Sequence, residues 1–304
     1  MNWLFGLTML FIGCTQNASD TVISLQLNWT PEAEHGGYYQ ALEEGYYKEE
    51  GLDVEIRSGG SGVRVETETA LQRSHFGITN ADKLLSVREK GLKIIALLAP
   101  FQSSPRVLIH HKSNPISSFE DLSKAKLLIL NNTKPFYRFL VNKYPKLKNI
   151  DTIPYNKAVF MENKQSVMQG YVNAEPLVFN KKGLPVEVLK LSEIGFNPYA
   201  SLLICSEDLL KERPELVQKM QQASIKGWLK YLEDPTKGNK AITKLNPSLT
   251  DHITESANQL PPLMKSDSHF GDMKLERFEE LAEQLIKVGV LEKKPAYDNL
   301  FLNP

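Results

Sequence analysis

The stretch that decides the fold is NWTPEAEHGGYY, residues 28–39. A short run with alternating apolar side chains precedes it, and a helical pattern follows it. A strand that turns into a helix leaves backbone N–H groups unpaired beside the positive end of the helix dipole, which favours ligand binding. Trp29 adds a flat apolar face at this turn, and His35 adds a polar group. We therefore expect residues 28–39 to form one wall of a small-molecule cleft.

Beyond this turn, predicted strands and helices alternate along the chain. Residues 52–56 alternate between polar and apolar side chains, which predicts a half-exposed strand, and the mostly apolar run at 92–99 predicts a buried one. The pattern restarts near residues 111–118, and the chain becomes mainly helical from Ser206. Such alternation is typical of parallel α/β units. The 304 residues are enough for two lobes of this kind.

Composition excludes several classes of protein. Hydrophobic residues make up 41% of the chain and the formal net charge is +0, so nothing favours nucleic acid as a partner. The two cysteines, Cys14 and Cys205, form neither a disulfide framework nor a metal-ligand spacing. A glycine-rich loop at 58–62 lacks the phosphate-loop and dinucleotide-binding patterns. We expect a monomer with no cofactor and no metal.

The N-terminus resembles a bacterial lipoprotein signal. Residues 1–19 carry no charged side chain, and the apolar run within them is too short to span a bilayer. It ends at Cys14, although the basic residues of a usual signal are missing. We expect a signal peptide at 1–13, lipidation of Cys14 and a tether at 14–20. The protein would then be anchored to a membrane in the periplasm or at the cell surface. An ordinary secretory signal is the alternative.

Several segments carry a resemblance to a known family. They are WTP at 29–31 with HG at 35–36, EGYYKEEGLDV at 44–54, FGITNAD at 76–82, GYVNAEP at 170–176 and RPELV at 213–217. Together they resemble the SsuA/THI5/NMT1-like periplasmic solute-binding proteins, which serve ABC importers. Members of that family bind thiamine pyrimidine precursors, riboflavin, sulfonates or nitrate.

The resemblance implies an α/β fold of the type II periplasmic-binding-protein class. Two α/β lobes would be joined by a two-strand hinge, with a ligand cleft between them. The first lobe would comprise residues 21–111 and 203–304, and the second residues 112–202. Strands near 106–110 and 199–205 would form the hinge. Ligand would favour the closed arrangement, since some of its contacts form only there.

Candidate ligand-binding residues lie where predicted strands end. They are Trp29, His35, Tyr38, Asn80, Asp82, Ser103, Asn132, Tyr171, Asn173 and Glu175. Tyr171, Asn173 and Glu175 would share one face if their segment is extended. Structural roles remain open for five others: Trp29 in the core, Tyr38 in a core stripe, His35 in a local hydrogen bond, and Asp82 or Asn132 as a helix cap.

Glu175 bears on the class of ligand. A carboxylate in the cleft disfavours a bare sulfonate or nitrate and suits a ligand with N–H donors, such as an aminopyrimidine. The leading hypothesis is a solute-binding protein that delivers a thiamine pyrimidine precursor to an ABC permease. A sulfonate, taurine, nitrate or riboflavin-type solute is the alternative.

An enzyme is the less favoured hypothesis. Fungal members of the family make the thiamine pyrimidine, with a histidine at the place of His35 as a source of atoms. They also carry a cysteine-rich run before the second hinge. Here residues 197–201 read NPYAS, without a cysteine. We therefore expect no enzymatic activity.

Overall fold

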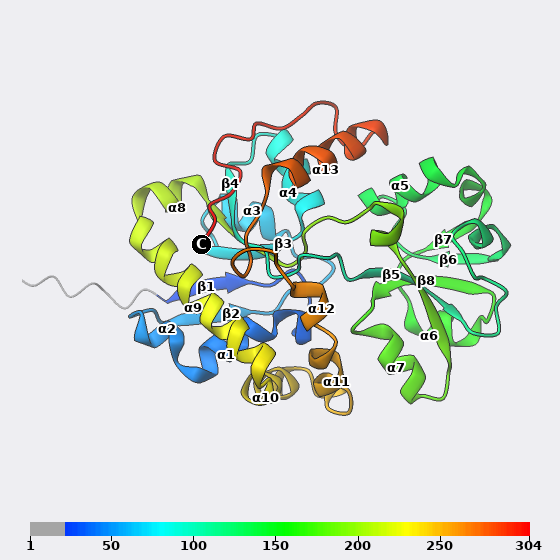
Figure 1. Cartoon of the computed structure of the whole chain (residues 1–304), viewed down its shortest axis with the longest axis horizontal. Helices are drawn as coiled ribbons and strands as arrows, with labels where there is room; N and C mark the ends of the chain where they lie inside the picture. Colours follow the sequence, from blue (N-terminus) through cyan, green and yellow to red (C-terminus); the bar gives the residue numbers. More distant parts are fainter. Residues whose placement is uncertain (1–21) are drawn as a thin grey trace, which may run out of the picture.

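The computed structural model describes residues 22–304, which form two α/β lobes (Figure 1). Each lobe is built on a five-stranded sheet. The first sheet has the order β2 (Val54–Arg57), β1 (Ile23–Gln26), β3 (Phe76–Thr79), β10 (Leu202–Ser206), β4 (Ile94–Leu98). The second has the order β7 (Asp151–Ile153), β6 (Leu127–Ile129), β8 (Ser166–Tyr171), β5 (Arg106–His111), β9 (Val186–Lys190). The predicted α/β class and two-lobed fold are confirmed.

The two sheets share one pattern of pairing. In the first, β1 pairs in parallel with β2 and β3, and β10 runs antiparallel to β3 and β4. In the second, β6 pairs in parallel with β7 and β8, and β5 runs antiparallel to β8 and β9. Each lobe therefore contains one strand that the chain supplies after crossing from the other lobe.

This pairing corrects the predicted lobe boundary at residue 111. The prediction placed residues 21–111 in the first lobe, with a hinge strand near 106–110. In the structure β5 is hydrogen-bonded between β8 and β9, within the second sheet. The crossing segments lie just outside the sheets, where Phe101 and Ala200 form an isolated antiparallel bridge.

Helices cover the sheets of both lobes. The first lobe carries α1 (Gly36–Glu44), α2 (Tyr46–Glu49), α3 (Val65–Ala70), α4 (Ala81–Glu89), α8 (Glu207–Glu212), α9 (Pro214–Glu233), α10 (Thr236–Leu245), α11 (Ile253–Asn258), α12 (Pro261–Met264) and α13 (Leu275–Lys287). The second carries α5 (Pro135–Lys143), α6 (Lys157–Glu162) and α7 (Glu175–Lys181). Short 3-10 helices lie at Ala33–His35, Glu120–Lys124, Pro145–Asn149, Leu191–Ile194 and Pro247–Leu249. Figure 1 shows the second lobe as the smaller body, on the right.

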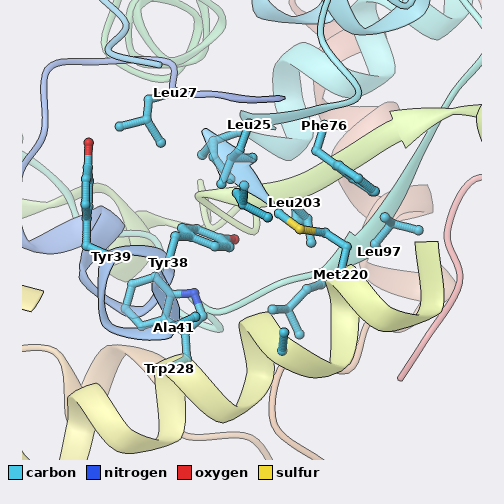
Figure 2. Close-up of a cluster of buried hydrophobic side chains, with 14 of the residues drawn as sticks. Leu25, Leu27, Tyr38, Tyr39, Ala41, Phe76, Leu97, Leu203, Met220 and Trp228 are labelled. Atoms are coloured by element: carbon cyan, nitrogen blue, oxygen red, sulfur yellow. The ribbon is translucent and has the colours of Figure 1, made fainter. Parts of the chain in front are cut away.

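The first-lobe core is formed where α1 crosses α9. Figure 2 shows Tyr38 beside the indole of Trp228, and the two ring centroids are 5.5 Å apart. Close approach of the helices depends on glycine, because a Cβ on Gly37 would lie 2.1 Å from the Trp228 ring. Gly227 is constrained in the same way, because a Cβ added to it would lie 2.3 Å from the Gly37 carbonyl oxygen. This packing fixes the helix that follows the residue 28–39 turn.

The predicted signal peptide at 1–13, Cys14 and the tether at 14–20 lie outside the described residues. Within residues 22–304, no helix combines the length and the apolar character needed to cross a bilayer.

Candidate functional site

The first-lobe wall of the cleft is the turn that follows β1. Its backbone is supported by the glycine-rich loop, since the Gly59 N–H donates to the Trp29 carbonyl oxygen at 2.9 Å. A Cβ on Gly59 would lie only 2.2 Å from the Leu27 carbonyl oxygen, so this position requires glycine. The loop thus holds the backbone that carries Trp29, whose side chain stays half-buried at the lobe boundary.

His35 holds the same turn together from inside. Its side chain is fully buried, and burial lowers its pKa to about 3, so the ring is neutral. The Glu32 N–H donates to Nδ1 at 3.4 Å, and Nε2 donates to the Asn28 Oδ1 at 2.9 Å. Both ring nitrogens are therefore used within residues 28–35. This geometry corresponds to the structural role that the sequence left open for His35.

Three carboxyl groups gather between the lobes: Glu32 and Glu34 from the turn, and Glu175 from the start of α7. We call them the acidic cluster. Burial first, and then the charge of Glu175, raises the pKa of Glu32 to about 8. Burial first, and then Glu32 and Glu175, raises the pKa of Glu34 well above its usual value. Glu34 lies 3.8 Å from His35 Nε2, but this contact is not an ion pair because His35 is neutral at pH 7.

The second-lobe wall meets this turn through an aromatic contact. The Trp29 and Tyr155 rings approach edge to face, with centroids 6.2 Å apart. The Tyr155 hydroxyl donates to Glu175 Oε1 at 2.6 Å, and the Tyr171 N–H donates to Oε2 at 2.8 Å. These bonds fix the Glu175 carboxylate beside the aromatic pair.

The segment from Tyr171 to Glu175 is not extended, which corrects the predicted shared face. β8 ends at Tyr171, a turn follows, and α7 begins at Glu175. The Glu175 carboxylate returns to the Tyr171 backbone as a result of this turn. Asn173 is buried, and its Nδ2 lies 3.4 Å from the Ser256 Oγ of the first lobe.

Asn80 links the first lobe to both the second lobe and a crossing segment. Its Nδ2 donates to the Tyr171 hydroxyl at 3.3 Å, and its Oδ1 accepts from the Ser201 N–H at 3.0 Å. Ser201 has a φ of 51°, a left-handed conformation that is uncommon for a residue other than glycine. The Asn80 bond therefore supports a strained point of the chain where it re-enters the first lobe.

Four other predicted residues lie apart from the acidic cluster or show only local contacts. Tyr38 is fully buried in the first-lobe core, and its hydroxyl donates to the Ser201 carbonyl oxygen at 3.4 Å. Asp82 is buried in the first turn of α4. Ser103 lies on a crossing segment, where its N–H donates to the Leu263 carbonyl oxygen at 2.9 Å. Asn132 is exposed, and its Nδ2 donates to the Thr152 hydroxyl at 2.9 Å.

Sequence reasoning missed Glu32, Glu34 and Tyr155 as site residues. Glu32 and Glu34 flank Ala33 within the quoted turn, but their spacing resembles that of an ordinary acidic helix start. Tyr155 follows β7 at the end of a strand, which was an available signal. Arg106, the first residue of β5, is also absent from the predicted set. Its guanidinium lies 4.8 Å from the Phe136 ring centroid and 5.7 Å from that of Tyr171.

The lobes are in contact along one edge of the cleft. A cavity of about 10 Å³ remains there, lined by first-lobe residues such as Glu32 and His252 and second-lobe residues such as Lys157 and Ala174. A space of this size holds about one water molecule. Nearby, the Lys181 Nζ lies 3.5 Å from a Glu255 carboxylate oxygen across the lobes. This edge must open for a ring-sized solute to pass. Among residues 22–304, no group of three or more His, Cys, Asp or Glu side chains could hold a metal ion.

Comparison with known proteins assigns the family. The profile described as NMT1/THI5 like matches residues 32–238, more than half of the 304 residues. The chain belongs to the NMT1/THI5-like family. The match begins at Glu32, so it includes all three members of the acidic cluster.

Relatives of this NMT1/THI5-like chain include binding proteins and enzymes. It is 27% identical over 72% of its length to the riboflavin-binding protein RibY of Chloroflexus aurantiacus, and spans 65% of that relative. It is 23% identical over 97% of its length to a formylaminopyrimidine-binding protein of Halalkalibacterium halodurans, and spans 96% of it. It is 22% identical over 76% of its length to the 4-amino-5-hydroxymethyl-2-methylpyrimidine phosphate synthase THI13 of Saccharomyces cerevisiae, spanning 73% of it.

A solved structure supports the fold. The periplasmic aliphatic sulphonate-binding protein SsuA of Escherichia coli superposes with a TM-score of 0.70 at 12% identity. The match covers 93% of this chain and 92% of SsuA. At this identity the likeness concerns the periplasmic-binding-protein fold and not the ligand.

Proposed function

We propose that this chain is the solute-binding component of an ABC importer and holds a flat nitrogen heterocycle between its lobes. The observation that carries the proposal is the contact of Trp29 with Tyr155 across the lobe boundary, beside the fixed carboxylate of Glu175. Aromatic faces favour a flat ring, by about 0.5–1.5 kcal/mol beyond burial. The carboxylate accepts hydrogen bonds from ring or amino N–H groups.

The acidic cluster supports N–H donors over a bare anion. A sulfonate or nitrate beside Glu175 would add negative charge where burial and mutual repulsion already raise the pKa values of Glu32 and Glu34. An aminopyrimidine would instead donate to these oxygens. The relative named for formylaminopyrimidine binding, which matches nearly the whole chain, supports this class. Riboflavin is the second candidate, because it also carries a flat ring with an N–H donor and RibY is a relative.

Binding without chemistry agrees with the state of His35. The synthases among the relatives leave an enzyme as the competing function. His35 is neutral, and each of its ring nitrogens is engaged by the surrounding turn. These bonds account for its burial without a catalytic role. Loss of ring atoms from His35 in a mass spectrum of protein incubated with iron would contradict a purely binding function.

The position in the cell is part of the same proposal. A signal peptide at 1–13 and lipid on Cys14 would hold the protein at the outer face of a membrane, beside its permease.

The first lobe would comprise residues 22–104 and 202–304, and the second lobe residues 105–201. We propose that the protein acts as a monomer, since the cleft is formed within one chain.

Ligand screening by thermal shift tests the function. The panel is hydroxymethylpyrimidine, formylaminopyrimidine, riboflavin, taurine and nitrate. A ligand at 100 times its Kd stabilises the native protein by about 2.7 kcal/mol. We expect a pyrimidine to give the largest shift. Trp29→Ala should weaken that pyrimidine about tenfold, whereas Trp29→Phe should retain most of the affinity because a ring remains. A shift with taurine or nitrate alone, or unchanged pyrimidine affinity in Trp29→Ala, would contradict the proposal.

A further inference from the structure

The cleft has a positive region in addition to the acidic cluster. Arg106 begins β5, opposite Tyr171 in the β8 register. Its guanidinium lies within reach of the faces of Phe136 and Tyr171, an arrangement that holds a cation by its attraction to the rings. Tyr171 also accepts the hydrogen bond from Asn80 of the first lobe, which places this region at the lobe boundary.

Arg106 lacks a matching anion in the described part of the chain. Its Nε is buried and has no hydrogen-bond partner among residues 22–304. The carboxyl group whose pKa Arg106 lowers is Glu34, but burial and its acidic neighbours raise that pKa well above the usual value. Glu34 therefore holds its proton more tightly than usual, which weakens it as a partner for the guanidinium. A buried guanidinium nitrogen without a partner is costly, and a bound anion that accepts from it would remove that cost.

Other cations surround this region. Partial burial, and then the charges of Lys83 and Arg106, lower the pKa of Lys134, whereas Asp82 opposes the shift. Lys134 is the residue that precedes α5, on the second lobe, and Lys83 lies in α4 of the first. Lys134 is thus close enough to feel the charges of Arg106 on its own lobe and of Lys83 on the other.

We propose that the solute carries an anionic oxygen group, a carboxylate or a phosphate, that binds Arg106 between the two aromatic rings. The planar fork of arginine matches the two oxygens of such a group. The N–H donors of the same solute would face the acidic cluster. The cleft would therefore bind a bipolar heterocycle more tightly than either a neutral ring or a bare anion. This inference rests on the proposed function, since it assumes a heterocycle between the lobes.

Calorimetric titration with matched pyrimidines tests the inference. The neutral parent is 4-amino-5-hydroxymethyl-2-methylpyrimidine, and the anionic probes are its monophosphate and 4-amino-2-methylpyrimidine-5-carboxylate. Taurine is the anion without a ring. A charge-assisted hydrogen bond is worth about 1.5–3 kcal/mol, so at least one anionic probe should bind roughly ten- to hundredfold tighter than the parent. Taurine should bind more weakly than that probe.

Arg106→Gln should abolish this preference and leave the parent affinity within about threefold, because an uncharged side chain of similar length makes no charge-assisted bond. Arg138→Gln on exposed α5 surface is the matched control and should keep the preference. If Arg106→Gln does not fold, Arg106→Lys keeps the charge but loses the fork, and should reduce the preference only in part.

Three results would overturn the inference. They are parent binding as tight as that of both anionic probes, equal weakening of parent and anions by Arg106→Gln, and taurine binding as tight as that of the best anionic pyrimidine. Binding of the parent without an anion preference contradicts this inference alone. Binding of none of the pyrimidines contradicts the proposed pyrimidine function, and the inference fails with it.

Discussion

Glu32→Gln should remove much of the pH dependence of stability between pH 5 and 7. Glu32 lies at the lobe boundary, where burial and then the charge of Glu175 raise its pKa to about 8 from the model-peptide value of 4.5. Lys157 and a hydrogen bond from Trp29 oppose this shift but do not cancel it. In the native state the carboxyl group therefore holds its proton more tightly than in the unfolded chain.

The sign of the effect follows from this difference in proton binding. The native state binds more protons than the unfolded state, so its stability falls as pH rises. The contribution is fully present below pH 4.5 and is lost progressively up to about pH 8. Each pH unit within this window is worth at most about 1.4 kcal/mol. Between pH 5 and 7, Glu32 should therefore remove up to about 2–3 kcal/mol of unfolding free energy.

Urea unfolding at pH 5, 6 and 7 measures this loss directly. We expect a steep loss of stability with pH in the wild type and a shallower one in Glu32→Gln. Part of the dependence remains in the variant because the pKa of Glu34 is raised too. Glu187→Gln is the matched control, since Glu187 is exposed on β9. Equal slopes in the wild type and Glu32→Gln would refute the assignment of Glu32 to a buried acidic cluster.

Two further predictions concern the first-lobe core. Gly37→Ala should lower the unfolding free energy by about 1–3 kcal/mol, because the new methyl group meets the Trp228 ring. Urea unfolding measures this loss, and Gly62→Ala is the control because a Cβ there meets nothing within 4 Å. Equal stability of Gly37→Ala and the wild type would contradict the packing. Cys205 is fully buried, and burial raises its pKa to about 12, so iodoacetamide should modify it only in denaturant; rapid labelling of native protein would contradict its placement in β10.

Local patterns predicted the elements better than their pairing. The mostly apolar run at 92–99 contains β4, whose five residues are all buried, because a strand covered on both faces needs apolar side chains on both. Residues 107–111 are also buried, but an apolar strand would be buried in the same way in either sheet, so burial does not decide between the lobes. Its partners β8 and β9 lie far along the chain, so the sequence alone could not assign β5 to the second lobe.

Site residues could be predicted where the residue type and its position at the end of a strand were enough to indicate a role. Trp29, Asn80 and Glu175 take part in contacts within or across the lobe boundary. Pro176 could have indicated the start of α7, because proline favours the first turn of a helix, and would have argued against an extended segment. The acidic cluster forms only because the two lobes are in contact. The spacing of Glu32, Glu34 and Glu175 along the sequence does not predict that contact.

The two bonds of Asn80 have a consequence for how the protein releases its cargo. The bond to Ser201 stays within the first lobe and its crossing segment, whereas the bond to the Tyr171 hydroxyl spans the gap. Opening must break the second and can preserve the first. Asn80 thus stays bonded to the first lobe through Ser201, while its bond to the second lobe through Tyr171 can form and break. Opening must also break the Asn173–Ser256 and Lys181–Glu255 contacts, and the neutral Asn80 bond is among those that cost little to undo.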